Sequence, residues 1–269
     1  MEERETERPG HAVELATELV SGGGFDLLLA VGGDGTVSEV AAGMLGVVSD
    51  GELLILGVMP LGAGNDFQRT AGGLVTGGDL ATRLAEAEPA VMDAGRIRFE
   101  EEDRADQYFV NVANVGFSAA VGERVERSFR SWPRMAGYLV GAIVTLAGYG
   151  NPWIELEIDG ERRECRANSV IMALGNYFGQ GMKVAPDAVA DDGLFDVVLI
   201  QDIGKLELLA AYPRLYTGSH VRHPKVEVMR GGRVSIRADR GVAVEGDGDM
   251  RGALPATFEV LPGALRVIA

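Results

Sequence analysis

The sequence predicts an N-terminal α/β domain with a Rossmann-like parallel sheet (residues 1–90) and a C-terminal antiparallel β-sandwich (residues 91–269). Two observations predict this division. Up to residue 90, short apolar runs alternate with helically spaced apolar residues, which is typical of a parallel sheet covered by helices. Beyond it, many short strand-like runs are separated by turns rich in Gly, Asp and Pro, which favours a sandwich.

The α/β part begins with a predicted helix over residues 11–20, which ends at a run of glycines. The apolar run 27–31 is too short for a helix, so it predicts a buried parallel strand. The apolar spacing becomes helical again after Thr36. A second buried strand over 53–58 and a weaker helix over 80–87 complete the alternation.

The sandwich part contains a series of candidate strands interrupted by candidate helices. Strands are expected over residues 91–99, 108–115, 153–158, 166–174, 195–201, 226–229, 234–238, 242–245 and 257–261. Helices are expected over residues 119–129, 133–146 and 205–216.

The chain is strongly acidic, with 40 Asp and Glu against 25 Lys and Arg and a formal net charge of −15. This charge argues against a broad basic face for nucleic acid. The only lysines are Lys183, Lys205 and Lys225. An acidic protein with almost no lysine is typical of high-salt cytoplasm, where screening relieves self-repulsion. We therefore expect a halophilic protein.

Cys165 is the only cysteine, and His11, His220 and His223 are scattered, so we expect neither a disulfide framework nor a cysteine or histidine metal cluster. The first residues are charged, which argues against a signal peptide. The longest apolar stretch, residues 135–149, is interrupted by glycines and falls short of a membrane span. We expect a cytoplasmic protein.

The turn after the first strand is the first candidate site. Gly32 and Gly33 break the strand, and the backbone N–H groups at the start of the next helix then converge on one point. Such a point binds phosphate, and Asp34 in its middle indicates a metal or a proton acceptor. The alternative is that Gly-Gly-Asp-Gly is only a tight turn.

A second glycine-rich turn follows the strand over 53–58 and carries Asp66. Because parallel strands end at a shared sheet edge, we expect Asp34 and Asp66 to converge there. Two carboxylates beside a phosphate nest are best explained by Mg²⁺ and a nucleotide. Neither turn is followed by Gly-Lys-Ser/Thr, so neither is a P-loop.

Four motifs resemble those of the soluble diacylglycerol kinase-like lipid kinases, which are relatives of sphingosine and ceramide kinases. They are Gly32-Gly33-Asp34-Gly35-Thr36, Pro60-Leu61-Gly62-Ala63-Gly64-Asn65-Asp66-Phe67, Asp191-Asp192-Gly193-Leu194-Phe195-Asp196 and Asp247-Gly248-Asp249. The resemblance covers essentially the whole chain. It implies ATP- and Mg²⁺-dependent phosphoryl transfer to a hydroxyl of diacylglycerol or a related lipid, at a membrane surface and without a transmembrane span. A homodimer is left open.

The resemblance also implies roles for individual residues. Those that would hold ATP are Thr6, Gly33, Asp34, Gly35, Thr36, Val37, Ser38, Glu39, Gly62, Ala63, Gly64 and Asn65. Those that would surround the catalytic Mg²⁺ are Asp34, Asp66 and Asp93, and a second, structural Mg²⁺ would be held by Asp192 and the carbonyls of Val189 and Leu194. Asp249 stands at the place of the general base that removes the proton of the lipid hydroxyl. The aspartates at 192 and 247 also fit ordinary hairpin turns.

The chain departs from the family pattern in three respects. Ala63 stands where the family has Thr, and Asp249 stands where Glu is usual. Relatives open with a strand and an Asn-Pro-x-x-Gly phosphate loop, so the N-terminal sheet is expected to lack its first strand. An inactive relative that binds nucleotide or lipid is therefore one alternative, and a NAD kinase-like enzyme is another, because it shares the Gly-Gly-Asp-Gly turn. We interpret the helix over 133–146 as buried in the core, and bordering a lipid-accepting cleft is the alternative.

Overall fold

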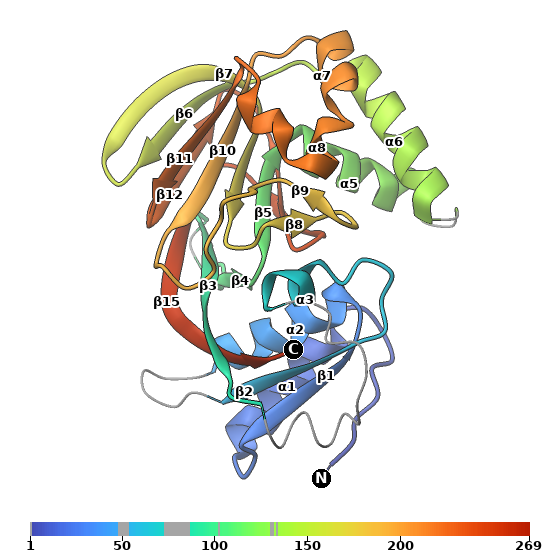
Figure 1. Ribbon diagram of the computed structural model, residues 1–269, viewed down its shortest axis with the longest axis vertical. Helices are drawn as coiled ribbons and strands as arrows, with labels where there is room; N and C mark the ends of the chain where they lie inside the picture. Colours follow the sequence, from blue (N-terminus) through green and yellow to red (C-terminus); the bar gives the residue numbers. More distant parts are fainter. Residues whose placement is uncertain (1, 48–53, 73–86, 102, 130–131, 133) are drawn as a thin grey trace.

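The computed structural model describes residues 2–47, 54–72, 87–101, 103–129, 132 and 134–269. Over these ranges the chain forms an α/β unit and a β-sandwich, drawn one below the other in Figure 1. The fold class predicted from the sequence is therefore confirmed.

The α/β unit is built on two parallel strands, β1 (Leu27–Gly32) and β2 (Ile55–Pro60). Its helices are α1 (His11–Gly22), α2 (Asp34–Leu45) and the short α3 (Asp66–Thr70). Helix α1 packs closely on α2 at Gly43. A Cβ added at this glycine would lie only 2.5 Å from the backbone oxygen of Val13. The predicted elements of this unit are confirmed, except for the helix over 80–87, of which residues 80–86 lie outside the described residues.

The sandwich consists of two sheets that share the long strand β7 (Glu161–Ala173). One sheet contains β3 (Ala90–Phe99), β4 (Gln107–Phe109), β15 (Ala256–Ile268), β12 (Arg233–Ala238), β6 (Trp153–Ile158) and the first half of β7. The other contains β11 (Val226–Gly231), β10 (Phe195–Gln201), the second half of β7, β5 (Val112–Gly116), β13 (Ala243–Gly246) and β14 (Asp249–Ala253). Apolar side chains from both sheets fill the core, where the rings of Phe109 and Phe195 stack with centroids 5.7 Å apart.

Short elements and helices cover the second sheet on its outer side (Figure 1). They are α5 (Phe117–Ser128), α6 (Arg134–Gly148), β8 (Tyr177–Phe178), β9 (Met182–Lys183), α7 (Lys205–Ala211), α8 (Arg214–Thr217) and the 3₁₀ helix η1 (Ser219–Arg222). The prediction of one helix over 205–216 is wrong, because the helix breaks before Pro213, which has no N–H to continue it.

Two further predictions about elements are wrong. The strand expected over 108–115 is divided between β4 and β5, which pair with different strands. The helix expected to be buried in the core, α6, buries only one side: Gly141 faces α5, where an added Cβ would lie 2.7 Å from Val125. On its other side Leu139 and Ile143 are 62% and 58% exposed.

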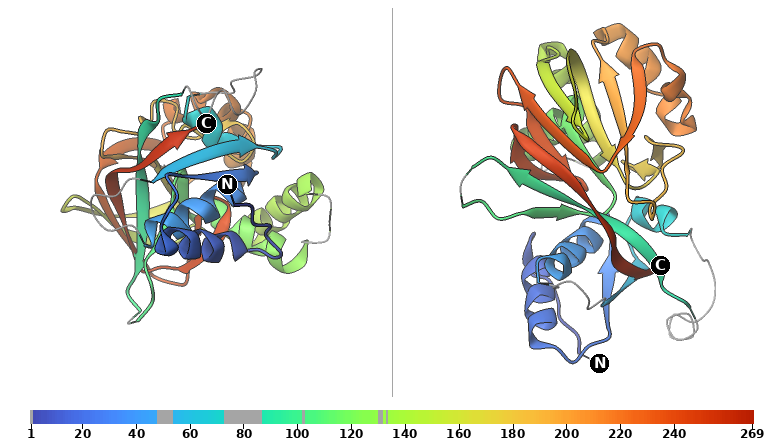
Figure 2. Two further views of the ribbon diagram at one scale, coloured as in Figure 1. Left: turned by 90° about the horizontal axis from the view of Figure 1, so that it is seen from below. Right: turned by 90° about the vertical axis from the view of Figure 1, so that its left-hand side faces the viewer.

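Strand β15 joins the two units, as Figure 2 shows. It pairs with β3 and β12 in the sandwich, and its last residues, 266–268, pair in parallel with β2. The strand changes register between Leu261 and Leu265, around Gly263, whose positive φ of 60° favours glycine. The C-terminal residues therefore complete the N-terminal sheet, and the division after residue 90 stays a prediction.

Candidate functional site

The two glycine-rich turns meet at one edge of the parallel sheet. The backbone N–H of Leu61 donates to the carbonyl of Gly32 over 2.8 Å. Gly62 and Gly33 face each other so closely that a Cβ on Gly62 would lie 2.6 Å from the Cα of Gly33. A side chain at Gly62 would push the two loops apart. Glycine at this position is therefore required by the contact between the loops.

Asp34 and Asp66 begin the two helices that follow these turns, and they converge. The backbone N–H of Phe67 donates to Oδ1 of Asp34 over 3.0 Å. A Cβ added at Gly64 would lie 2.7 Å from Oδ2 of Asp34 and 3.5 Å from Oδ2 of Asp66, so both carboxylates face this glycine. The structure therefore brings Asp34 and Asp66 together at the sheet edge, as the parallel strands predict.

Asp66 is almost completely buried and is held by a third segment. Its two carboxylate oxygens accept hydrogen bonds from the backbone N–H groups of Gln180 and Gly181, each over 2.7 Å. Burial raises the pKa of Asp66, and the charge of Asp34 raises it further, while the two N–H groups act in the opposite direction. The loop between β8 and β9 thus closes over the aspartate pair.

The start of α2 provides backbone donors beside this pair. Gly33 occupies the N-cap position and no side chain caps the helix, so its first N–H groups are free of side-chain acceptors. An added Cβ at Gly35 would meet no atom within 4 Å. An uncapped helix start with an uncovered glycine fits an anion such as phosphate.

Other residues expected to hold ATP have different surroundings. Ser38 is buried and donates its hydroxyl to Asp247, and Glu39 accepts from the backbone N–H groups of Gly10 and Ala12 at the start of α1. Of the other residues expected to hold ATP, Thr6 and Ala63 are exposed, Val37 is buried in the core, and Thr36 packs over Gly32. Side-chain contacts from Ser38 and Glu39 to phosphate are therefore not supported.

Asn65 adopts a left-handed conformation with a φ of 51°, and its buried Oδ1 has no hydrogen-bond partner among the described residues. An unpaired buried amide oxygen is costly. It lies beside the contact between the two loops, 3.2 Å from a Cβ added at Gly62. The position agrees with the role expected for Asn65 beside a bound nucleotide, which stays a prediction.

Asp247 joins the sandwich to α2, a role that the sequence did not suggest. Its carboxylate accepts from the hydroxyl of Ser38 over 2.8 Å and from three successive backbone N–H groups at residues 110–112, over 2.8 to 3.0 Å. These three groups lie where the expected strand over 108–115 divides into β4 and β5. One carboxylate therefore fixes both the break in the strand and the position of the neighbouring hairpin against α2.

Asp249, two residues further on, has a half-exposed side chain with Arg251 3.7 Å away. Partial removal from water raises its pKa, and the charges of Glu39 and Asp247 raise it further, against the influence of Arg251. No contact among the described residues joins Asp249 to Asp34. The hairpin packs on α2 at Ser38, one helical turn and about 6 Å along the axis from Asp34.

Glu245 is a second residue of this region that sequence reasoning missed. It is 8% exposed and pairs in register with Asn114 of β5, whose buried Oδ1 has no hydrogen-bond partner among the described residues. Burial raises the pKa of Glu245 to about 7, and the charges of Asp247 and Asp249 add to the effect. Its spacing of two residues from Asp247 and four from Asp249 could have suggested that the three carboxylates lie together. Asn114 is buried inside the sandwich.

The expectation that Asp93 joins Asp34 and Asp66 around a metal stays a prediction, and the structure shows two other partners of its carboxylate. The Asp93 carboxylate accepts from the backbone N–H groups of Gly193 and Gly263, each over 2.7 Å. Asp93 therefore fastens the bend of β15 to the loop after residue 190, and both of its oxygens are used in that contact. It could not have been recognised in the sequence, because the two donors lie 100 and 170 residues away.

The second metal site, expected at Asp192 and the carbonyls of Val189 and Leu194, stays a prediction. The Asp192 carboxylate forms an ion pair with Arg230 and accepts from the backbone N–H of Leu194. Val189 is 45% exposed. Asn176, in the same region, donates to three backbone carbonyls.

Comparison with known proteins identifies the family. The diacylglycerol kinase catalytic domain matches residues 1–97, and the YegS C-terminal NAD kinase beta sandwich-like domain matches residues 111–269. A diacylglycerol kinase of Mycobacterium tuberculosis is 31% identical over 251 residues, which cover 91% of this chain and 77% of that protein. The chain belongs to the diacylglycerol kinase family. A diacylglycerol kinase of Bacillus subtilis is 26% identical over 247 residues, covering 91% of this chain and 78% of that protein.

Solved structures of this family share the fold. A crystal structure of a diacylglycerol kinase from Bacillus anthracis superposes with a TM-score of 0.69 over 98% of this chain and 82% of that chain, at 19% identity. Another structure from the same organism gives a TM-score of 0.75 at 22% identity, covering 98% of this chain and 84% of that chain. The family resemblance drawn from the four motifs is confirmed, and membership of a kinase family implies the use of ATP.

The residues at the aspartate pair fit a Mg²⁺ ion only in part. Among the described residues there is no group of three or more His, Cys, Asp or Glu arranged to hold a metal. Mg²⁺ bound to a nucleotide, however, needs one or two carboxylates and takes its other ligands from phosphate and water. Oδ2 of Asp34 has no donor partner within the described chain, whereas both oxygens of Asp66 already accept backbone N–H groups. Asp34 is thus the residue that fits a direct metal ligand.

Proposed function

We propose that this protein is an ATP- and Mg²⁺-dependent lipid kinase that transfers the γ-phosphate of ATP to a hydroxyl of diacylglycerol or a related lipid. The observation that carries the proposal is the convergence of Asp34 and Asp66 where the two glycine loops touch. Family membership supports the class of reaction. The names of the relatives support diacylglycerol as the first acceptor to test.

The parts of the site have separate tasks in this proposal. The uncapped start of α2 and the loop around Gly62 bind the phosphates of ATP through backbone N–H groups. Asp34 holds Mg²⁺, which would neutralise charge on the transferring phosphoryl group. Asp66 orients the second loop through its bonds to Gln180 and Gly181. Positioning and charge neutralisation are what a loose phosphoryl-transfer transition state requires.

In the transfer itself, the bond between the γ-phosphorus and the bridging oxygen to the β-phosphate breaks. The lipid hydroxyl oxygen forms the new bond to phosphorus, ADP leaves, and the hydroxyl proton passes to a carboxylate. Asp249 is the proposed acceptor of that proton, because it is accessible, its pKa is raised, and it belongs to the hairpin that packs on α2 at Ser38.

The direct test is phosphoryl transfer from γ-labelled ATP, with Mg²⁺, to diacylglycerol in detergent micelles. Parallel reactions contain NAD or no acceptor. Labelled lipid supports the proposal, labelled NAD would favour a NAD kinase-like enzyme, and ATP binding without any labelled product would favour an inactive relative. A chelator and Mg²⁺ add-back test the metal.

The role of Asp249 has a matched pair of variants. Asp249→Asn removes the proton acceptor and is expected to lower kcat about 100-fold or more while ATP affinity changes little. Asp249→Glu supplies the residue usual in the family and is expected to keep substantial activity. A loss of ATP binding in Asp249→Asn, with kcat unchanged at saturation, would mean that Asp249 binds nucleotide instead.

A further inference from the structure

The tip of the hairpin between β8 and β9 has an uncommon backbone conformation. Gly179, Gln180 and Gly181 all have positive φ angles, of 59°, 70° and 95°. Glycine adopts such angles without strain, whereas a residue that carries a Cβ is disfavoured there. The chain therefore keeps a glutamine at a position where the backbone alone would favour a third glycine.

Gln180 also differs from the other strained residues of the described chain. The four other non-glycine residues with a positive φ are all Asn or Asp, namely Asn65, Asp103, Asp159 and Asp247. Asn and Asp tolerate the left-handed region because their short polar side chains bond to the local backbone. The longer side chain of Gln lacks this advantage. A strained residue that the surrounding structure retains is commonly found at a functional site.

The backbone of this tip is held in place from two sides. The N–H groups of Gln180 and Gly181 donate to the two carboxylate oxygens of Asp66, each over 2.7 Å. The guanidinium of Arg69 packs against the tip, since a Cβ added at Gly181 would lie 2.7 Å from its Nη1. The position from which the Gln180 side chain starts is therefore fixed relative to the aspartate pair.

The side chain of Gln180 lies over the second glycine loop. A Cβ added at Gly64 would lie 3.6 Å from its Cγ, and the same point would lie 2.7 Å from Oδ2 of Asp34 and 3.5 Å from Oδ2 of Asp66. The side chain and the two carboxylates thus surround one glycine. Gln180 is exposed, and its side-chain amide has no hydrogen-bond partner among the described residues. The amide is free to bind a ligand at this place.

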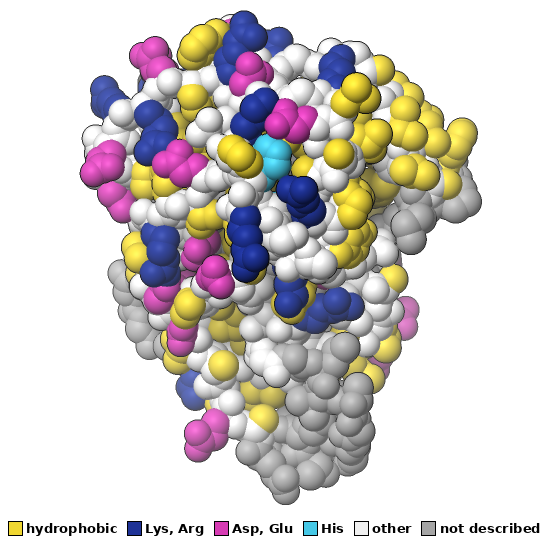
Figure 3. All heavy atoms as spheres, turned by 45° about the horizontal axis from the view of Figure 1, so that its top comes forward, with side chains coloured by type: hydrophobic (Ala, Val, Ile, Leu, Met, Phe, Trp, Pro, Cys, Tyr) yellow, Lys and Arg dark blue, Asp and Glu magenta, His cyan; other side chains and the backbone are white. Residues whose placement is uncertain are grey.

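Two cations lie beside the hairpin. The guanidinium carbon of Arg69 and the ammonium of Lys183 lie 5.9 Å and 5.6 Å from the centroid of the Tyr177 ring. Neither lies within 4 Å of a carboxylate in the part of the chain that the structure describes. Figure 3 shows several Lys and Arg side chains gathered in the middle of the face that it draws. In a chain of net charge −15, cations without a carboxylate partner favour an anionic ligand here.

We infer that the side-chain amide of Gln180 binds the γ-phosphate of ATP. The inference deepens the proposed function and rests on it for the identity of the nucleotide. Asp34 is the residue that fits a direct metal ligand, and the metal of a phosphoryl-transfer site bridges the β- and γ-phosphates. Because Gln180 and Asp34 meet at Gly64, the amide faces this end of the triphosphate.

The γ-phosphate is a better partner for this amide than the β-phosphate. Gln180 belongs to the sandwich, which also carries Asp249, the proposed proton acceptor. Both residues thus approach from the side of the lipid acceptor, toward which the transferred phosphoryl group must point. A neutral amide donates to phosphate without forming an ion pair with Asp34, as a lysine at this position would do.

Nucleotide binding tests the inference without lipid and without turnover. Full-length protein is titrated calorimetrically in aqueous buffer that contains Mg²⁺, either with a non-hydrolysable ATP analogue or with ADP. Gln180→Gly is expected to weaken binding of the analogue about tenfold and to change the affinity for ADP by less than about twofold. The midpoint of its urea unfolding is expected to stay the same or rise, because glycine relieves the backbone strain. No helix among the described residues is both long and apolar enough to cross a bilayer.

Two further substitutions separate the amide group from the bulk of the side chain. Gln180→Met keeps the length of the side chain and the strained backbone but removes the donor, so the same loss of about tenfold is expected for the analogue. Gln180→Glu replaces the donor with a carboxylate and is expected to lose more, since the carboxylate repels the γ-phosphate. The matched control is Asp103→Gly, which relieves a φ of 69° in the turn between β3 and β4. It is expected to bind both nucleotides like the unmodified protein.

Three results would overturn the inference. An equal loss of analogue and ADP in Gln180→Gly, with a lower urea midpoint, would show that the residue only holds the loop. Unchanged nucleotide affinities with a raised KM for the lipid would assign the amide to the acceptor. Full affinity for the analogue in Gln180→Met would show that the amide makes no contact with it.

A separate assay of diacylglycerol phosphorylation by the unmodified protein distinguishes the two proposals. If no lipid is phosphorylated but the Gln180 variants selectively lose the ATP analogue, the proposed function fails and the inference stands. If lipid is phosphorylated while the variants bind the analogue like the unmodified protein, only the inference fails. If the unmodified protein binds neither nucleotide, both fail.

Discussion

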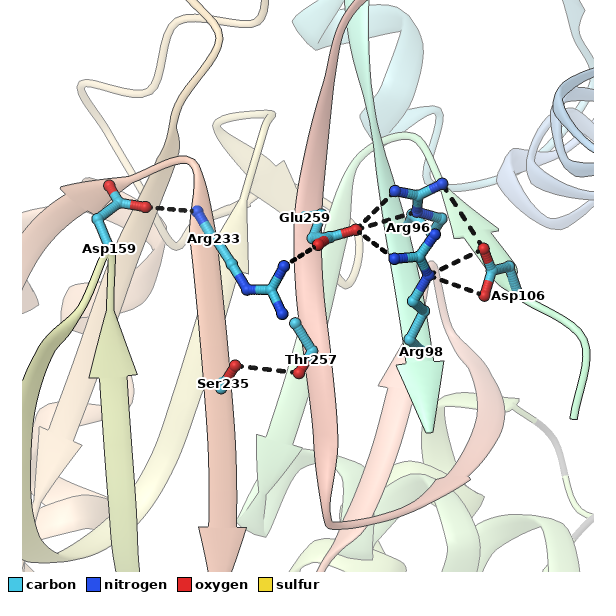
Figure 4. Close-up of polar contacts among 8 residues, drawn as sticks. All are labelled: Arg96, Arg98, Asp106, Asp159, Arg233, Ser235, Thr257 and Glu259. Atoms are coloured by element: carbon cyan, nitrogen blue, oxygen red, sulfur yellow. Dashed lines mark hydrogen bonds and ion pairs between the residues drawn. The ribbon is translucent and has the colours of Figure 1, made fainter. Parts of the chain in front are cut away.

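Two glutamates of the sandwich, Glu259 on β15 and Glu245 on β13, have opposite surroundings. The Glu259 carboxylate forms ion pairs with Arg96, Arg98 and Arg233, as Figure 4 shows. Burial alone would raise the pKa of Glu259, but the three guanidinium groups outweigh it and hold the pKa below its usual value. Glu245 lies instead among other carboxylates, and its pKa is raised to about 7.

The contrast separates two uses of carboxylates in this protein. Those around Glu259 are paired with arginines and stabilise a sheet, whereas those around Glu245 repel one another beside α2. The Glu259 cluster crosses three strands of one sheet, and Asp106 pairs with two of its arginines, Arg96 and Arg98. Such a network stabilises this face of the sheet. Glu245, Asp247 and Asp249 crowd together next to α2, with Arg251 as the cation that opposes their repulsion. A crowded group of carboxylates costs stability, and such groups are commonly found at functional sites.

The largest expected effect is on activity at the site itself. Asp34→Asn keeps the size of the side chain but removes its charge, and kcat/KM for lipid phosphorylation is expected to fall about 1,000-fold. Glu259→Gln changes a carboxylate that pairs with arginines in the sandwich, and it is expected to leave kcat/KM within about twofold of the unmodified protein. Steady-state kinetics with labelled ATP compares the two. An Asp34→Asn enzyme with unaltered turnover would contradict the role given to Asp34.

The next largest effect concerns Asp247. Asp247→Ala leaves the hydroxyl of Ser38 and the backbone N–H groups of residues 110–112 without their acceptor. The free energy of unfolding in urea is expected to fall by about 3 kcal/mol or more. The control is Asp159→Ala, since Asp159 accepts from two backbone N–H groups in an exposed turn, and about 1 kcal/mol is expected there. Equal losses in the two variants would contradict a special role for Asp247.

The two glutamates are expected to affect stability with opposite dependence on pH. Glu245 keeps its proton up to about pH 7 in the folded chain but loses it near pH 4.5 when unfolded, so the folded state binds more protons between these values. The contribution of Glu245 to stability is therefore full below pH 4.5 and is lost as the pH rises to about 7. The loss amounts to at most about 3 kcal/mol. Glu245→Gln is expected to remove this dependence and to be more stable than the unmodified protein at pH 8.

Glu259 provides the opposite sign in the same experiment. Its folded pKa is lowered, so the unfolded state binds more protons near that pKa, and the stabilisation is present above the usual pKa and lost as the pH falls below it. Glu259→Gln is expected to destabilise the protein at neutral pH and to matter less in acid. Urea unfolding at several pH values measures both variants. Identical pH profiles for the two would show that the contrast in their surroundings is wrong.

The smallest effect is that of salt, which sharpens the same comparison. Molar KCl screens both the repulsion among unpaired carboxylates and the ion pairs of the Glu259 cluster. In a chain of net charge −15, relief of repulsion is expected to prevail, so Tm rises in KCl. The cost of Glu259→Gln is expected to shrink by about 0.5 kcal/mol under the same conditions. A protein most stable in low salt would contradict the prediction that it is halophilic.

The sequence by itself determined the fold class and the centre of the candidate site. Short apolar runs followed by glycine turns specify parallel strands, and parallel strands must end at one sheet edge. The approach of Asp34 to Asp66 is a consequence of that geometry and needs no knowledge of other contacts. The four motifs likewise sufficed to recognise the family.

The tertiary structure alone decided which partners the other carboxylates have. Asp247 meets Ser38 from 209 residues away, and Asp93 meets Gly263 from 170 residues away. The ion pair between Asp192 and Arg230 and the outward side of α6 also depend on how distant segments pack. An aspartate beside a glycine has the same local pattern whether it binds a metal, caps a turn or joins two strands. Its function depends on which donors and charges the fold brings to it, and no local pattern in the chain encodes them.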